Sequence, residues 1–379
     1  MTKIAVVTGT RAEYGLLKPV MREIQKKSTL QLIVTGMHLS RKHGLTYKII
    51  EEDSFKIDKK VKMHAIDDTN LSMVKALGEG IKGIAKAVND LDPDIVLVLG
   101  DRSEALAGAI AGAYLNKVVA HIHGGEVSKA SIDESNRHAI TKFAHIHFPA
   151  TPTAARRIEL LGERTENIYL VGAPGIDAIT NKNYLDEYEV RQKYGLSEKP
   201  LVLVIQHPTT QEDNLADVHM RLTLEALKEV EADNLVIYPN NDAGGQAIIN
   251  VIESSELPNN FKTYENVPRE DFLGLMSVAS AMVGNSSSGI IEAPSFHLPV
   301  VNIGLRQKGR LRVENVIDVP HEKEAIKQAL IRAIFDKDYR KKIRGVKNPY
   351  GDGCSSKRIV KILNELVINN ALIQKQITY

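Results

Sequence analysis

The sequence has no tryptophan and a single cysteine among its 379 residues, and its charges nearly cancel. Cys354 has no second cysteine with which to form an intramolecular disulfide, and no CxxC pair is present to bind zinc or to carry out redox exchange. With 49 Lys and Arg against 47 Asp and Glu, the chain has no strong field that would attract a polyanion. We therefore expect a cytoplasmic protein that does not bind nucleic acid.

Long apolar runs are also missing. The apolar run Ile4–Val7 is too short for the hydrophobic region of a signal peptide. Later runs such as Ile95–Leu99 and Leu201–Ile205 fall far short of the roughly 20 residues that span a bilayer. Their β-branched residues are instead typical of strands buried on both faces, so we expect no membrane segment.

Short apolar runs alternate with amphipathic stretches along the whole chain. This alternation is typical of βαβ units, in which helices cover both faces of a parallel sheet, so the predicted fold class is α/β. The predicted strands of a first sheet are Ile4–Val7, Leu32–Thr35, Ile95–Leu99, Val118–Ile122 and Ile146–Pro149, with Ile168–Val171 closing it. The predicted helices between them are 16–27, 70–90, 103–115 and 152–161.

A second series of strands begins at LVLVIQHP and continues through NLVIYPN, FKTYENVP, SAMVGNSSSG and PVVNIG. Between the two series lies a stretch rich in Gly, Pro and Asn, followed by the charged segment YLDEYEVRQKYGLSEKP, which we interpret as a linker. The sequence therefore predicts two Rossmann-like domains, over residues 1–173 and 174–354.

Open parallel sheets bind ligands beyond the carboxyl ends of their strands, where this chain has four polar loops. The first, TGTRAEYG, is neither the dinucleotide motif GxGxxG nor the phosphate motif GxxxxGK[ST]. Arg11 beside a tight glycine turn is suited to contact a phosphate, or it is the surface residue of a capped helix.

The loop GNSSSG places small residues and three serine hydroxyls between a strand and a predicted helix. Such a loop can hold a diphosphate, and three successive serines exceed what an ordinary N-cap requires. Glu292, one turn into the predicted helix, is placed to accept the two hydroxyls of a ribose, or it is a favourable charge near the positive helix end.

The loops LGDRSE and HIHGGE carry acids and bases. Asp101 has no packing role after its apolar strand, which favours chemistry over its other interpretation, the N-cap of the next helix. His121 and His123 share one face of a predicted strand and, with Glu126, form a possible metal site of two histidines and one carboxylate. General acid and base catalysis is the preferred interpretation of this segment.

Taken together, the motifs resemble those of the hydrolysing UDP-N-acetylglucosamine 2-epimerases, which open sialic acid synthesis by making N-acetylmannosamine and UDP. The resemblance covers nearly the whole chain in order: GTRAEYG, VTGMH, LGDR, HIHGGE, IDES, RHAITK, QHPTT, PNNDAGG, GNSSSGIIE, NIGLRQKGR and VIDVP. It implies two domains facing a cleft in a GT-B-like arrangement, with a C-terminal helix over about 355–379 that packs back on the first domain. It also implies a UDP-sugar substrate, no metal or other cofactor, and a homo-oligomer, either dimer or tetramer.

The resemblance assigns roles residue by residue. The implied UDP contacts are Arg11, Arg102, His207, Asn240, Ser286, Ser287, Glu292 and Arg306. The implied catalytic carboxylates are Asp101 and Asp133. Animal-type members have HIEGGE where this chain has HIHGGE, so the third catalytic group is either His123 or Glu126.

The C2 proton of the sugar does not lie next to a carbonyl, so direct abstraction is too unfavourable. Loss of UDP from C1 with removal of the C2 proton gives a 2-acetamidoglucal, to which water adds at C1 and a proton at C2 from the other face. Rival interpretations are an epimerase of UDP-2,4-diacetamido-2,4,6-trideoxyglucose in legionaminic acid synthesis, a GT-B glycosyltransferase, a non-hydrolysing epimerase and a non-catalytic sensor.

Overall fold

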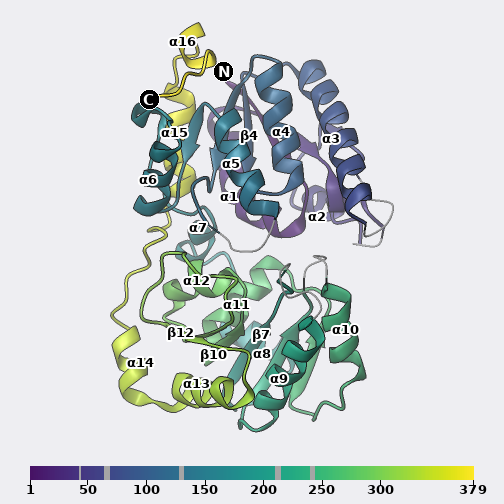
Figure 1. Ribbon diagram of the computed structural model, residues 1–379, viewed down its shortest axis with the longest axis vertical. Helices are drawn as coiled ribbons and strands as arrows, with labels where there is room; N and C mark the ends of the chain where they lie inside the picture. Colours follow the sequence, from purple (N-terminus) through teal and green to yellow (C-terminus); the bar gives the residue numbers. More distant parts are fainter. Residues whose placement is uncertain (42–43, 64–68, 128–131, 210–214, 240–243) are drawn as a thin grey trace. The chain divides into compact units, whose positions relative to one another are not determined.

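The computed structural model describes residues 1–41, 44–63, 69–127, 132–209, 215–239 and 244–379. The chain forms two compact units, each built on its own parallel sheet (Figure 1). Unit 1 comprises Met1–Glu126, Ile132–Asp177 and Gly351–Tyr379, so it contains both ends of the chain. Unit 2 comprises Ala178–Tyr350 together with Val127.

The sheet of unit 1 has six parallel strands in the order β3-β2-β1-β4-β5-β6. The strands are β1 (Lys3–Thr8), β2 (Thr29–Val34), β3 (Lys59–Lys60), β4 (Ile95–Leu99), β5 (Val118–Ile122) and β6 (Ile146–Phe148). The chain proceeds outward from β1 on one side and from β4 on the other. The loops after these two neighbouring strands therefore diverge, and this point of reversal is where such sheets bind ligands.

Helices cover both faces of this sheet because successive strand residues point to opposite sides. Ile4 and Val6 of β1 pack in a core with α1 and α15, whereas Ala5 and Val7 pack against α3, α4 and α5. The helices of unit 1 are α1 (Arg11–Lys27), α2 (Tyr47–Glu52), α3 (Asn70–Leu91), α4 (Ser103–Tyr114), α5 (Ile132–Phe143), α6 (Pro152–Leu160), α7 (Gly175–Thr180, which crosses into unit 2), α15 (Ser355–Glu365) and α16 (Asn370–Ile373).

Unit 2 repeats the plan with the strand order β12-β11-β10-β7-β8-β9. Its strands are β7 (Leu201–Ile205), β8 (Asp233–Ile237), β9 (Phe261–Tyr264), β10 (Ala281–Gly284), β11 (Val300–Ile303) and β12 (Val316–Val319). Its helices are α8 (Glu187–Tyr194), α9 (Ala216–Lys228), α10 (Gly245–Ser254), α11 (Arg269–Val278), α12 (Ser288–Ile291), α13 (Lys323–Phe335) and α14 (Lys337–Ile343). Here the point of reversal lies between β7 and β10.

The predicted α/β class with two Rossmann-like domains is confirmed, and three predicted elements need correction. Ile168–Val171 is not a sheet strand: its one bridge pairs Ile168 with His147, because Pro149 after β6 has no N–H to continue the ladder. The presumed linker contains α8, which begins with a capping box between Asp186 and Glu189. The predicted helix over about 355–379 is interrupted after Glu365 and resumes only as α16.

Two helices begin where the sequence predicted loops. α1 starts at Arg11 and not at residue 16, because the Thr10 hydroxyl caps it by accepting from the Glu13 N–H at 3.2 Å. α5 occupies the polar segment that follows HIHGGE. Within the described ranges, no helix is long and apolar enough to cross a membrane.

Candidate active site

The turn after β4 presents Asp101 at the point of reversal in unit 1. Gly100 has φ +78°, a left-handed conformation that glycine adopts without strain, and its carbonyl accepts a hydrogen bond from His121 Nε2 at 2.6 Å. Burial lowers the pKa of His121 to about 3, so this imidazole is neutral and holds the turn as a hydrogen-bond donor. The hydrogen bond from His121 thus fixes the turn, and the Asp101 side chain that follows it is partly exposed.

Arg137 of α5 lies at the centre of a group of charged side chains in unit 1. Its fully buried guanidinium pairs with the carboxylates of Asp101 and Glu134 and donates to the Glu126 carbonyl at 3.1 Å. Burial opposes this charge, but the carboxylates of Asp101 and Glu134 outweigh that cost and raise the pKa of Arg137. Asp101 is therefore held as an oriented carboxylate by a cation that stays protonated.

The first turn of α5 adds further acid and base groups beside this pair. Asp133 lies four residues before Arg137, on the same face of the helix, and is partly exposed. Glu134 is hydrogen-bonded to His138 Nε2 at 3.0 Å. Arg137 thus pairs with the predicted Asp101, and the predicted Asp133 lies about one turn before Arg137 on the same helix.

His123 and Glu126 lie in the turn between β5 and α5, and both are buried. His123 has φ +65° just beyond the end of β5, so it does not share a strand face with His121 as predicted. The Thr151 hydroxyl contacts Glu126 Oε1 at 3.5 Å. In the described part of the chain, no group of three or more His, Cys, Asp or Glu residues is arranged to hold a metal ion.

The first turn of α1, directly after β1, carries Arg11 and a buried acid. Glu13 accepts the Gly9 N–H at 2.7 Å, and burial raises the pKa of Glu13 to about 8 with a further contribution from Glu104. Arg102 Nε lies 3.4 Å from Glu104 Oε2. Two of the three arginines predicted to contact UDP thus follow neighbouring strands, and the buried carboxyls of Glu13 and Glu104 lie near Arg102.

In unit 2, Asn285 joins the three loops that follow β7, β10 and β11. Its side-chain oxygen accepts the His207 N–H at 2.7 Å, and its side-chain amide donates to the His207 carbonyl at 2.8 Å. Its own carbonyl accepts from Arg306 at 3.1 Å and from Gln307 at 2.7 Å. Two predicted UDP contacts, His207 and Arg306, are thereby fixed around one buried amide at the point of reversal.

The serines of GNSSSG follow directly, but the helix after them is shorter than predicted. α12 has a single turn, so it supplies little helix dipole, and Glu292 ends it instead of lying within it. Ser286 and Ser287 remain partly exposed. The Glu292 carboxylate is buried and paired with Arg269, the first residue of α11.

One predicted UDP contact, Asn240, lies outside the described residues. Four residues that organise the site were missing from the predicted set: Glu13, Arg137, Arg269 and Asn285. Arg137 lies in the motif RHAITK and Asn285 in GNSSSGIIE, so their place in these motifs could have indicated that they belong to the site. Nothing in the sequence indicated the pairing of Arg269 with Glu292.

Three kinds of similarity to known proteins bear on the identity of the chain. The family model described as UDP-N-acetylglucosamine 2-epimerase matches residues 22–364. A relative from Legionella pneumophila, UDP-N,N'-diacetylbacillosamine 2-epimerase (hydrolyzing), is 38% identical over 98% of both chains. A UDP-N-acetylglucosamine 2-epimerase from Neisseria meningitidis serogroup B is 35% identical over 89% of this chain and 90% of its own.

Among solved structures, the UDP-GlcNAc 2-epimerase of Neisseria meningitidis bound to UDP-GlcNAc matches with a TM-score of 0.82. The match covers 96% of this chain and all of that one at 21% identity, so it shows the shared GT-B-like fold. With a family model over most of its length and relatives well above 30% identity, the chain belongs to the UDP-N-acetylglucosamine 2-epimerase family.

Proposed function

We propose that this protein is a hydrolysing 2-epimerase that converts UDP-N-acetylglucosamine and water to N-acetylmannosamine and UDP. The observation that carries the proposal is the Asp101 carboxylate oriented by the buried Arg137, with Asp133 on the same helix. Two carboxylates, one paired with Arg137 and the other about one helical turn before it, are suited to remove a proton at C2 and to return one from the other face.

In this proposal, unit 2 binds the nucleotide. His207 and Arg306 are fixed by Asn285, and Ser286 and Ser287 offer hydroxyls to the diphosphate. Glu292 accepts the ribose hydroxyls, and its carboxylate is oriented by Arg269. Asn240, by its motif, belongs to the same set.

Unit 1 then acts on the sugar. As the base removes the C2 proton, the C1–O bond breaks and its electron pair leaves with UDP, giving the 2-acetamidoglucal. Water next adds at C1, and C2 receives a proton on the opposite face. Arg11 and Arg102 stabilise the charge that builds on the leaving diphosphate. Asp101 and Asp133 are the proposed catalytic carboxylates, with His123 or Glu126 as the third group.

A second substrate has specific support. The Legionella relative acts, by its name, on UDP-N,N'-diacetylbacillosamine, a 2,4-diacetamido-2,4,6-trideoxy sugar, and it is slightly more similar to this chain than the Neisseria relative. The same elimination at C1 and C2 serves both sugars, because they differ only at C4 and C6. We therefore propose UDP-N,N'-diacetylbacillosamine as the second candidate substrate. It becomes the preferred substrate if the protein turns it over faster than UDP-N-acetylglucosamine.

The experiment compares the two UDP-sugars side by side in D₂O and in ¹⁸O-labelled water, with proton NMR and mass spectrometry of the products. We expect free sugar with deuterium at C2, ¹⁸O at C1 and unlabelled UDP. The matched control is D90N on the exposed surface of α3, which should behave as wild type. The turnover of D101N should instead fall by about 10² to 10⁴. Accumulation of an epimerised UDP-sugar would make the protein non-hydrolysing. A requirement for an acceptor would make it a glycosyltransferase.

A further inference from the structure

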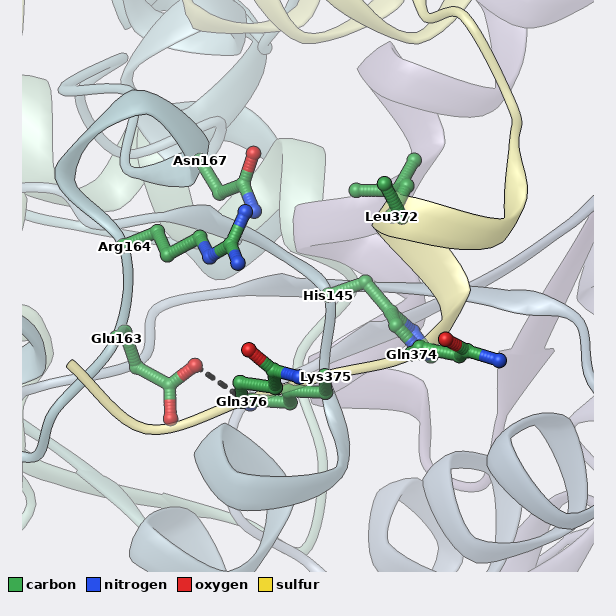
Figure 2. A pocket seen from close by; sticks show the side chains of 9 residues that line it. His145, Glu163, Arg164, Asn167, Leu372, Gln374, Lys375 and Gln376 are labelled. Carbon is green, nitrogen blue, oxygen red and sulfur yellow. Dashed lines mark ion pairs between the residues drawn. The ribbon is translucent and has the colours of Figure 1, made fainter.

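The last residues of the chain lie against the end of α5. Lys375 Nζ donates to the carbonyls of Thr141 at 2.7 Å and Ala144 at 2.5 Å, and it pairs with Glu163 Oε2 at 2.6 Å. Figure 2 shows Lys375 and Glu163 facing each other in a small pocket that His145 and Arg164 also line. The C-terminal segment therefore contacts the helix that carries the proposed catalytic group.

The chemistry of this contact matches what a helix end requires. The last carbonyls of a helix have no partner within the helix and attract a cation. An ammonium has three donors, and Lys375 has three acceptors around it. Lys142, the lysine of the last turn of α5, is engaged elsewhere, with Glu163 Oε1 at 2.7 Å and the Leu161 carbonyl at 3.0 Å.

Glu163 holds this arrangement from the opposite side. It is buried after α6, and besides the two lysines it accepts from His147 Nε2 at 3.1 Å. Burial would raise the pKa of Glu163, but these hydrogen bonds outweigh it and lower the pKa to about 2. Burial lowers the pKa of Lys375 to about 8, with a further contribution from the nearby Lys142, although the hydrogen bond and the charge of Glu163 raise it. At neutral pH both charges are present.

Other contacts keep the segment in place. His145 Nε2 lies 3.2 Å from the Ile373 carbonyl, and the Thr378 N–H donates to the Gly162 carbonyl at 3.2 Å. The ring of Tyr379 lies over Gly162, where a Cβ would come within 2.6 Å of it. The segment is thus tied on both sides of Lys375, and all of these residues belong to unit 1.

We infer that Lys375 is a positioning residue for the proposed reaction, which anchors the C-terminal end of α5 and so sets the place of Asp133 and Arg137. The inference rests on the proposed function. α5 has 12 residues and spans about 18 Å as a rigid rod, so a shift at its end is carried to its first turn. A displacement of about 1 Å at a reacting group can lower a rate on the order of 100-fold.

The experiment compares K375M, which removes the charge and all three donors, with K375R, which keeps a cation. The matched control is K361M, because Lys361 is an exposed lysine of the same C-terminal segment. Three quantities are measured on folded protein well below the unfolding temperature: kcat, the Kd for UDP, and deuterium uptake of peptides covering 132–143. K375Q, which keeps a donor but no charge, covers the case in which K375M does not fold.

For K375M we expect kcat to fall about tenfold, the Kd for UDP to change less than twofold, and α5 to take up deuterium about ten times faster. K375R should recover most of kcat, and K361M should match wild type. Unchanged kcat, or UDP affinity falling in step with kcat, would overturn the inference in favour of a purely structural role. If the wild-type protein released UDP from neither sugar, the proposed function would fail. Independently of activity, unchanged deuterium uptake of α5 in K375M would show that Lys375 does not anchor this helix.

Discussion

Replacing Glu13 by Gln should stabilise the protein increasingly as the pH rises. Glu13 is 6% exposed, its Oε2 accepts the Gly9 N–H, and its Oε1 has no hydrogen-bond partner. Burial raises the pKa of this carboxyl from 4.5 to about 8, and the nearby Glu104 adds to the shift. At neutral pH the folded protein therefore keeps a proton that the unfolded chain has lost.

The sign and size follow from the two pKa values. Below pH 4.5, Glu13 is protonated in both states and its neutral form fits the fold. Between pH 4.5 and about 8, only the unfolded state ionises, so the stability of the wild type falls as the pH rises. A shift of about 3.5 units at about 1.4 kcal/mol per unit gives a loss on the order of 5 kcal/mol. Gln has the same shape and can accept the Gly9 N–H, but it carries no proton to lose.

The assay is urea unfolding at pH 5 to 9, followed by far-UV circular dichroism and by the fluorescence of the 12 tyrosines. Two compact units can unfold in two transitions, so each is fitted separately. The control is E23Q on the same helix. Hydrogen bonds from Lys26 and Lys27 lower the pKa of Glu23, so its stabilising effect is complete above pH 4.5 and is lost only in more acidic solution.

We expect the free energy of unfolding of E13Q, relative to wild type, to increase by several kcal/mol from pH 5 to 8 and then to level off. E23Q should be less stable than wild type by a constant amount over the same range. A flat difference for E13Q, or one that decreases with pH, would refute the argument that Glu13 is buried in its neutral form.

Four further outcomes test the site. Asp101→Asn should lower turnover by about 10² to 10⁴ while UDP binds as before, measured by UDP release and titration calorimetry. Loss of UDP binding would instead assign this loop to recognition. Glu292→Gln removes a charge-assisted acceptor, so the Kd for UDP should rise about tenfold or more; unchanged affinity would remove Glu292 from the nucleotide site. Gly284→Ala should destabilise unit 2 by about 3 kcal/mol or more, because Gly284 has φ +127° and a Cβ would lie 1.9 Å from the Ile205 carbonyl. Urea unfolding that shifted only the transition of unit 1 would contradict this. Treatment with EDTA should leave turnover intact, and activity restored by one divalent metal would revive the metal interpretation of the HIHGGE turn.

The sequence predicted those features of the fold and site that depend on a single strand or a single loop residue. Strands such as Ile95–Leu99 are buried on both faces, so their apolar runs predict them and also place Asp101 at a strand end. The role of Arg137 escaped prediction because it depends on Asp101, which follows β4 and meets α5 only in three dimensions. α5 and α8 were missed because each buries few residues, and their polar sequences resemble loops. The raised pKa of Glu13 depends on its burial, which the neighbouring sequence does not indicate.

Unit 1 contains both ends of the chain, and this has a consequence for synthesis on the ribosome. Ile359, Val360 and Leu363 of α15 are buried in the same core as α1, and the Ser28 hydroxyl donates to Asn364 Oδ1 at 2.6 Å. The residues that complete this core are translated after all of unit 2, whose strands form a continuous stretch of the chain. About 350 residues separate β1 from α15, so at about 5 to 20 residues per second α15 is synthesised roughly 18 to 70 seconds after β1. We therefore expect unit 2 to fold first during translation, and a nascent chain stalled before Ser355 to expose an apolar face of α1 to chaperones.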